Sequence, residues 1–267
     1  MLIGIKCQEV LKLAVTQMAN FYDRIGKKFG GYAYGSNKPR YTSEYPAGDP
    51  EKVFKDEILK LKSNQKIVLD IGCGDGKFAF ELSPYFKKIV GIDNSKQLLK
   101  VAAHKLKEAK VKNLEFIFAN AQKIPFPTSK FDIAINRRGP SFYPEYHRIL
   151  KIGAYYLEIG IGEKDTKELK EIFGRGQNYQ NWDQSRLKKD VSEFKKLGFK
   201  IILAKDLYYQ EYYPNYHQID VFLQGVPIFE DYETKKDKIL LDKYIKKYQT
   251  KNGIVLNRHR VVYKLQK

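Results

Sequence analysis

Cysteine is scarce in this chain of 267 residues, which contains only Cys7 and Cys73. Because Cys73 lies inside a glycine-rich stretch, we expect no structural disulfide between the two. Four scattered histidines do not complete a zinc-binding set, so no metal site is predicted. The low cysteine content favours a reducing, cytoplasmic environment.

Long hydrophobic runs are also missing. No stretch approaches the roughly 18 to 20 apolar residues that span a bilayer, so we expect no membrane insertion. The first residues, MLIGIKCQEVLKLAV, have some features of a signal peptide. Charged Lys6, Glu9 and Lys12 interrupt them and no small-residue cleavage site follows, which favours an amphipathic helix, and Met18 is an alternative start.

Acidic residues are outnumbered, and among the basic ones arginine is rare. The chain has 49 lysines and arginines against 31 aspartates and glutamates, a formal charge of +18. Such a charge is typical of nucleic-acid-binding proteins. Only nine of the basic residues are arginine, the side chain that bidentate recognition of phosphates and bases favours. The lysines are spread along the chain beside acids, which favours a solvated surface and leaves RNA as an alternative partner.

The hydrophobic pattern predicts alternating strands and helices. Asp49 and Pro50 are typical of a helix start, and Ser95 is expected to cap another helix. Strands are expected at 66–72, 88–93, 114–120, 131–136, 153–162, 199–206 and 258–266, and helices at 50–62, 76–86, 96–110, 143–151 and 184–198. Strands separated by helices indicate a doubly wound α/β fold with a mostly parallel seven-stranded sheet.

The chain divides into four segments on this pattern. We expect an N-terminal cap at 1–48, a core at 49–205, a helical insertion at 206–252 and the last core strand at 253–267. The insertion contains an amphipathic helix with Leu241, Tyr244, Ile245 and Tyr248 on one face.

A glycine loop follows the first predicted strand in VLDIGCGDGKF, residues 68–78. Ligands of open parallel sheets bind beyond the carboxyl ends of the strands, and glycines let a ligand approach the main chain. The third glycine of the dinucleotide fingerprint G-x-G-x-x-G is replaced here by Lys77. The nucleoside-triphosphate motif G-x-x-x-x-G-K-S/T is absent as well.

An acid at the end of the next strand further restricts the class of ligand that the loop is expected to bind. Asp93 ends IVGID, 17 residues after Gly76. A carboxylate there accepts hydrogen bonds from ribose hydroxyls and repels a 2′-phosphate. The two segments together predict a nucleoside with free ribose hydroxyls.

Four segments in this order resemble the class I S-adenosylmethionine-dependent methyltransferases, of the small-molecule, UbiE-like (type 11) kind. They are VLDIGCGDGKF, IVGIDNS, FIFANAQKIPFPTSKFDIAIN and HRILKIGAYYLEIG, and the resemblance covers roughly residues 50–205. It implies S-adenosyl-L-methionine as cofactor, S-adenosyl-L-homocysteine as product, and these cofactor contacts: Asp70, Gly72, Cys73, Gly74, Gly76, Asp93, Asn94, Asn120, Ala121, Gln122 and Asn136.

Each group of these residues has an implied role. The resemblance places Asp70 and the glycines at the methionyl part, Asp93 at the ribose and residues 120–122 at adenine. Asn136 is placed near the reactive end. The family often has aspartate where this chain has Asn120, and an amide also accepts from the adenine amino group.

Methyl transfer from a sulfonium is an in-line displacement that chiefly requires alignment of the reactants. The missing catalytic triad and metal set are consistent with it. The stretch NRRGPSFYPE, after the fourth strand of the core, stands where relatives that methylate base or glutamine nitrogens have Asn/Asp-Pro-Pro-Tyr/Phe. Side chains alternate along an extended segment, so only one of the two arginines, Arg137, is expected to face the pocket and clamp an anionic acceptor. His147 and His217 are candidate bases by elimination.

Two segments are candidates for a lid. The N-terminal cap contains Gly30, Gly31 and Gly35 among aromatic residues, which favours a hinge. LYYQEYYPNYHQ, residues 207–218, is interpreted as core packing, a small-molecule pocket or a base-stacking surface. We therefore expect a small-molecule methyltransferase, with a methyltransferase of ribosomal or transfer RNA and a non-catalytic binder as alternatives.

Overall fold

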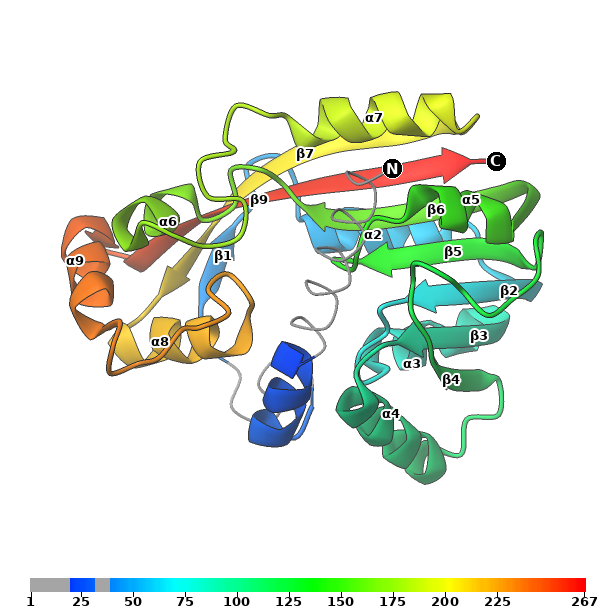
Figure 1. Ribbon diagram of the computed structural model, residues 1–267, viewed down its shortest axis with the longest axis horizontal. Helices are drawn as coiled ribbons and strands as arrows, with labels where there is room; N and C mark the ends of the chain where they lie inside the picture. The colour runs from blue at the N-terminus through cyan, green and yellow to red at the C-terminus, as the bar shows by residue number, and fades with distance from the viewer. Residues whose placement is uncertain (1–19, 32–38) are drawn as a thin grey trace, which may run out of the picture.

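The computed structural model describes residues 20–31 and 39–267, and these form a single mixed sheet with helices on both faces (Figure 1). The strand order is β1-β7-β9-β6-β5-β2-β3-β4, and β8 pairs with β9 alone. The strands are β1 Thr42–Glu44, β2 Ser63–Ile71, β3 Phe86–Asp93, β4 Leu114–Phe118, β5 Phe131–Arg137, β6 Leu150–Ile161, β7 Lys200–Tyr213, β8 Gln249–Thr250 and β9 Gly253–Gln266. Strands β2 to β6 run parallel, and β9 is antiparallel to both β6 and β7, so the α/β prediction is confirmed.

The helices of the core form where the sequence predicts them. They are α2 Pro50–Leu59, α3 Lys77–Leu82, α4 Lys96–Ala109, α5 Tyr143–Ile149 and α7 Arg186–Lys196. Asp49 caps α2 by accepting hydrogen bonds from the amides of Glu51 and Lys52, and Ser95 caps α4 by accepting from Leu98. Both caps satisfy amides that the first turn of a helix leaves without a partner.

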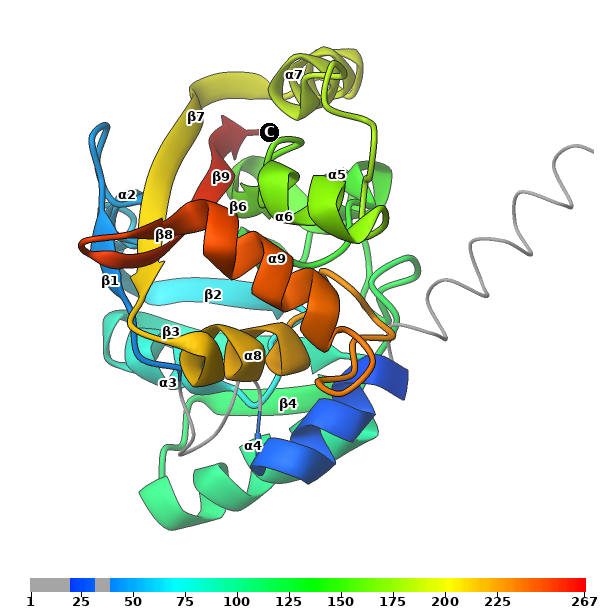
Figure 2. The ribbon, with the colours of Figure 1, turned by 90° about the vertical axis from the view of Figure 1, so that its left-hand side faces the viewer.

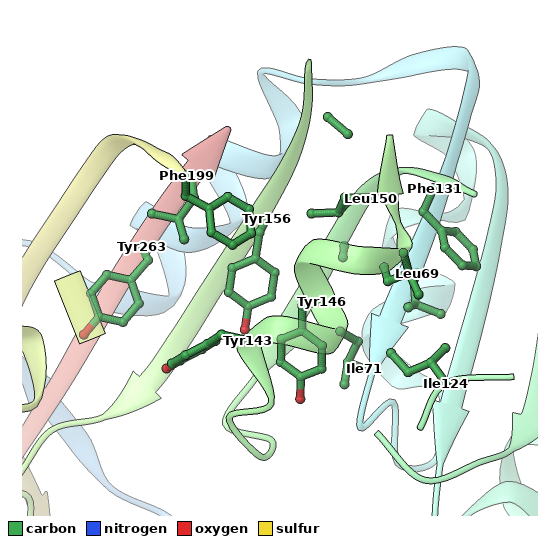
Figure 3. Close-up of a cluster of buried hydrophobic side chains, with 14 of the residues drawn as sticks. Leu69, Ile71, Ile124, Phe131, Tyr143, Tyr146, Leu150, Tyr156, Phe199 and Tyr263 are labelled. Atoms are coloured by element: carbon green, nitrogen blue, oxygen red, sulfur yellow. The ribbon is translucent and has the colours of Figure 1, made fainter. Parts of the chain in front are cut away.

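Two apolar layers hold these helices on the sheet. Phe54 and Ile58 of α2 pack with α3 against one face. The other face is covered by α5 and α7, and here a group of aromatic rings fills the space between helices and sheet (Figure 3). The hydroxyls of Tyr143 and Tyr263 both donate to Asp190, so these rings are buried without leaving a polar atom unpaired.

The long strands β7 and β9 differ from the prediction. A helical insertion was expected to begin at residue 206, but β7 continues to Tyr213 and pairs with β9 as far as Ile254. Buried and more exposed side chains alternate from Leu207 to Glu211, and the stretch LYYQEYY is rich in tyrosine, which suits a strand once a partner strand is present. The last strand was predicted at 258–266, but β9 already begins at Gly253. Strands β1 and β8 are additional to the seven predicted strands.

A second lobe packs around the carboxyl end of β7 and the amino end of β9 (Figure 2). It consists of α6 Lys167–Phe173, α8 Tyr216–Gly225 and α9 Lys238–Tyr248, with their own apolar cluster. Leu241 and Tyr244 of the predicted amphipathic helix are buried in that cluster. Most of the aromatic stretch packs as well: Tyr209, Tyr212 and Tyr213 are buried, whereas Tyr208 is 45% exposed.

A helix of residues 20–29 lies between the core and this lobe, near α4 and α8 (Figure 1, Figure 2). Asp23 accepts hydrogen bonds from the Ser95 hydroxyl and the Gln97 amide of the core, and Arg24 donates to the Glu230 carbonyl of the lobe. The expectations for residues 1–15, Met18 and Gly35 lie outside the described residues. No helix in the described ranges has the length and apolarity needed to cross a membrane.

Candidate active site

The glycine loop connects the carboxyl end of β2 to α3. Gly72, Gly74 and Gly76 all have left-handed backbones, with φ of +70°, +56° and +76°. The amides of Gly72 and Cys73 donate to the Ile92 carbonyl at 2.8 and 3.0 Å, which fixes the loop to the end of β3. Such φ values are accessible to glycine at little cost.

At position 76 a side chain is excluded by a neighbouring buried ring as well as by the backbone conformation. A Cβ on Gly76 would lie 2.5 Å from the ring of Phe116 on β4, whereas one on Gly72 would meet no atom closer than 3.7 Å. The Cys73 side chain also points into the sheet, because its Sγ would lie 2.8 Å from a Cβ on Gly91. Burial raises the pKa of its thiol, and the nearby Asp70 and Asp93 raise it further. The surface left for a ligand is therefore the main chain around Gly72 and Gly74.

Asp93 connects this loop to the end of β3. Its Oδ2 accepts from the Gly74 amide and its Oδ1 from the Ser95 amide, both at 2.8 Å. Burial raises the pKa of this carboxyl group, and the hydrogen bonds from the Ser95, Gly74 and Asn94 amides oppose the rise. Each carboxylate oxygen has a further lone pair, so Asp93 is able to accept from a ligand hydroxyl while it holds the loop.

Asp70 lies near the end of β2, just before the same loop, and has an acceptor without a partner among the described residues. The side chain is 2% exposed, and its Oδ2 has no hydrogen-bond partner within the described part of the chain. Burial raises its pKa to about 7, with Arg137 opposing the rise and Asp93 adding to it. A buried acceptor without a partner is costly in a folded protein, so this atom suits a cationic ligand group.

Residues 120–122 follow β4 at the neighbouring strand end. The Ala119 amide donates to the Asp93 carbonyl at 3.0 Å, which places this turn beside β3. The side-chain oxygen of Asn120 accepts from the Gln122 amide at 2.9 Å and shapes the turn. Asn120 and Gln122 are exposed and Ala121 is half-buried, so this turn is open to a ligand on its outer side.

Asn136, at the end of β5, supports the adjoining loop with its whole side chain. It is fully buried, its Oδ1 accepts from the Gly139 amide at 2.8 Å, and its Nδ2 donates to the Pro140 carbonyl and the Tyr156 hydroxyl. The amide expected near the reactive end therefore positions residues 137–140.

The two arginines depart from the expected alternation. Arg138 has φ +62°, so the chain is not extended there and both side chains turn to the same carboxylate. Arg137 Nε donates to Glu51 Oε2 at 2.9 Å, and Arg138 Nη1 donates to Glu51 Oε1. The expectation that the two side chains point to opposite sides is wrong, because it assumed extended backbone at Arg138.

Neither predicted histidine lies at the glycine loop. His147 precedes Leu150, which pairs with Phe131 at the amino ends of the parallel strands, the opposite edge of the sheet from the loop. Burial and Lys267 lower its pKa, and its ring packs edge-on against Phe199. His217 is exposed in the first turn of α8 in the second lobe.

The sequence interpretation missed a buried ion pair beside β5. Glu158 of β6 is fully buried, and its carboxylate accepts from Arg186 of α7 and from the Tyr156 hydroxyl. A Cβ on Gly160 would lie 2.3 Å from the Arg186 guanidinium, so this glycine makes room for it. The available signal was the acid in the apolar run YYLEIGIG.

A second group of buried charges was also missed, where β9 passes from the core to the second lobe. Arg258 and Arg260 both pair with Asp165, and Arg258 also pairs with Glu211. His259 is fully buried, with its Nε2 2.9 Å from Asp206. The signal was the RHR triplet in a strand that otherwise reads as apolar.

Comparison with known proteins agrees with this geometry. Residues 62–157, from β2 to the middle of β6, match the family model described as a methyltransferase domain. Over these residues the chain is similar to a methyltransferase domain. The matched residues include the glycine loop, Asp93, the turn at 120–122 and Arg137, and they end before the second lobe.

Relatives of this methyltransferase domain are similar over part of their length. Demethylmenaquinone methyltransferase of Lactococcus lactis is 38% identical over 87 residues, which are 32% of this chain and 34% of that protein. The Listeria welshimeri protein of the same name is 32% identical over 133 residues, 45% of this chain and 56% of its own length. The chain thus spans between about a third and just over half of these curated relatives.

A third relative has a solved structure. The uncharacterized methyltransferase YcgJ of Bacillus subtilis is 33% identical over 130 residues, 44% of this chain and 51% of that protein. Its crystal structure superposes with a TM-score of 0.58 over 81% of this chain and 98% of YcgJ, at 20% identity. At that identity the superposition supports the fold alone.

Proposed function

We propose that this protein transfers the methyl group of S-adenosylmethionine to a small-molecule acceptor, as an enzyme of class EC 2.1.1. The observation that carries the proposal is the loop of left-handed glycines held by Asp93, together with the unpaired carboxylate oxygen of Asp70 at the end of the preceding strand. The main chain of the glycine loop, the Asp93 carboxylate and the unpaired oxygen of Asp70 together suit a nucleoside that carries a cationic group.

The residues present fit this cofactor. The loop backbone at Gly72 and Gly74 would lie along the methionyl part, the Asp93 carboxylate would accept from the ribose hydroxyls, and the turn at 120–122 would flank adenine. When bound, S-adenosylmethionine supplies a methyl group whose departing sulfur needs no protonation. The protein then has to align acceptor and methyl group and to exclude water.

A small acceptor is favoured by the helix of residues 20–29. This helix connects α4 to the second lobe through Asp23 and Arg24, and Phe21 and Ile25 are each 4% exposed. A cavity of about 150 Å³ lies between it and the lobe. An RNA strand would have to displace this packed helix, whereas a small molecule would be enclosed by it.

Two relatives are named for methylation of demethylmenaquinone, so this quinone is the first acceptor to test. The family match ends at residue 157, before the second lobe, which lines the cavity beside the helix of residues 20–29. We therefore propose that the acceptor of this chain differs from demethylmenaquinone in the part that the second lobe contacts. An anionic acceptor is compatible with the excess of positive charge.

The test is a methyl-transfer assay with labelled cofactor on demethylmenaquinone, on pooled cell metabolites and on total RNA in parallel. Label in the small-molecule fraction supports the proposal, and label in RNA alone would reject it. The formal charge of +18 keeps RNA methylation as the second candidate. An RNA enzyme should bind RNA with an affinity that falls steeply with salt concentration, and a cytoplasmic small-molecule enzyme should not.

A further inference from the structure

We propose that Arg137 binds the carboxylate at the amino-acid end of the cofactor, and that Glu51 positions its guanidinium for this contact. The inference rests on the proposed function and assigns a recognition site for one part of its cofactor. The amino-acid end of S-adenosylmethionine carries an ammonium and a carboxylate on one carbon. Its recognition therefore requires one acid and one base held close together beside the glycine loop.

The strand register places Arg137 beside Asp70. Asp70 of β2 pairs with Ile135 of β5, and Arg137 lies two residues further along the same strand. Side chains two residues apart point to the same face of a sheet. Ile135 packs in the apolar layer below α2 and α3, so Asp70 and Arg137 both lie on that side. Arg137 is also the base that lowers the pKa of Asp70, in agreement with this proximity.

The guanidinium of Arg137 is held with one end open. Its Nε donates to Glu51 at 2.9 Å, and its central carbon lies 5.4 Å from the ring centroid of Phe78 on α3. Its Nη1 and Nη2 atoms donate to no acceptor within residues 20–31 and 39–267, and the side chain is 31% exposed. The two terminal nitrogens of an arginine match the two oxygens of a carboxylate.

Glu51 is suited to the positioning role. Burial would raise its pKa, but Arg138 and Arg137 outweigh that effect and lower the pKa to about 2. The carboxylate is therefore charged at every pH at which the enzyme would work. It also binds Arg138, so it is held from two sides while it fixes the Nε edge of Arg137.

The unpaired oxygen of Asp70 indicates that Arg137 binds the carboxylate of the cofactor and not a carboxylate of the methyl acceptor. Asp70 Oδ2 is buried without a partner on the same side of the sheet, so an ammonium is expected next to Arg137. A ligand group with an ammonium and a carboxylate satisfies both residues. An acceptor carboxylate would satisfy Arg137 and leave Asp70 unpaired.

Calorimetry with two ligands tests the proposal. S-adenosylhomocysteine carries the amino-acid end, and 5′-methylthioadenosine lacks it. We expect Arg137→Gln to weaken S-adenosylhomocysteine about 10- to 100-fold, which corresponds to one charged hydrogen-bonded contact, and to leave methylthioadenosine unchanged. Glu51→Gln should weaken S-adenosylhomocysteine less, again without affecting the shorter ligand. Arg40→Gln, on an exposed residue, is the matched control.

The outcomes separate this inference from the proposed function. If the wild-type protein binds neither ligand, the proposed function is rejected and the inference with it. If the wild type binds both and Arg137→Gln binds S-adenosylhomocysteine normally, or loses both ligands equally while its circular dichroism is unchanged, only the inference is overturned. Arg137→Lys keeps the charge without the paired donors and should give an intermediate affinity, which also covers the case in which the glutamine variant fails to fold.

Discussion

Asp93 Oδ2 lies 2.8 Å from the amide nitrogen of Gly74 and accepts its hydrogen bond. The acid that ends β3 thus holds the centre of the loop that follows β2. One side chain shapes the loop and, in the proposed function, grips the ribose. Loop geometry and cofactor affinity are therefore expected to change together when Asp93 is altered.

Replacement of Asp93 by alanine should weaken binding of S-adenosylhomocysteine at least about 10-fold, because two charge-assisted contacts to the ribose are lost. Isothermal titration calorimetry measures the affinity, and circular dichroism checks the fold. The exposed Asp183→Ala serves as control. Wild-type affinity in Asp93→Ala would remove the ribose assignment.

Gly76→Ala should destabilise the protein by about 2 to 4 kcal/mol. The alanine would have to adopt φ +76°, and its Cβ would lie 2.5 Å from the Phe116 ring. Backbone strain and overpacking therefore both destabilise the variant. Urea unfolding gives the free energy. Gly198→Ala is the matched control, since its φ is +86° and no atom lies within 4 Å, and it should lose only about 1 kcal/mol. Equal losses in the two variants would show that Phe116 is not the constraint.

Asp70 should make the ligand-free protein less stable as the pH rises from about 4 to about 7. Burial raises its pKa to about 7 in the folded protein from an ordinary value of 3.8, so the folded state binds the proton more tightly than the unfolded one. The groups that act on it are Arg137, which opposes the shift, and Asp93, which adds to it; Asp70 in turn raises the pKa of Cys73. The cost is complete above pH 7, at up to about 4 kcal/mol.

Asp70→Asn removes this titration while it keeps the shape of the side chain. Its free energy of unfolding should exceed that of the wild type at pH 8 and approach the wild-type value near pH 4. Urea unfolding at several pH values measures the difference, with the exposed Asp183→Asn as control. A difference that does not grow with pH would contradict the burial of an unpaired carboxylate at this position.

Arg186→Met should destabilise the protein by about 3 to 5 kcal/mol, because it leaves the fully buried Glu158 without its countercharge. The double variant Arg186→Met with Glu158→Gln should recover part of that loss, since residue 158 no longer carries a buried charge and only Asp190 still lacks its Arg186 partner. Thermal unfolding of the single and double variants measures the coupling between the two sites. The exposed Lys188→Met is the control, and additive effects would show that the ion pair contributes nothing.

The order of the core elements was predictable because its signals are local. The buried β2 and β3, the caps at Asp49 and Ser95 and the left-handed glycines of the loop depend on a few neighbouring residues. The assignments of Asn120, Gln122 and the other cofactor contacts remain predictions that the binding experiments test. The common direction of Arg137 and Arg138 was not predictable, because a left-handed φ at an arginine has no sequence signature.

Long-range partners decided the rest. The stretch from Leu207 to Tyr213 is a strand because β9 pairs with it, and β9 lies more than 40 residues further along the chain. The position of His147 at the far edge of the sheet likewise follows from the pairing of β5 with β6.

By itself the sequence determined a glycine loop and an acid at adjacent strand ends, because alternation of apolar residues, caps and glycines acts over a few residues. Only the tertiary structure decided that Glu51 collects both arginines, that Asp70 keeps an unpaired oxygen and that Glu158 meets Arg186. Those relationships join residues from separate elements, and their energies depend on burial, which arises only when the elements pack together.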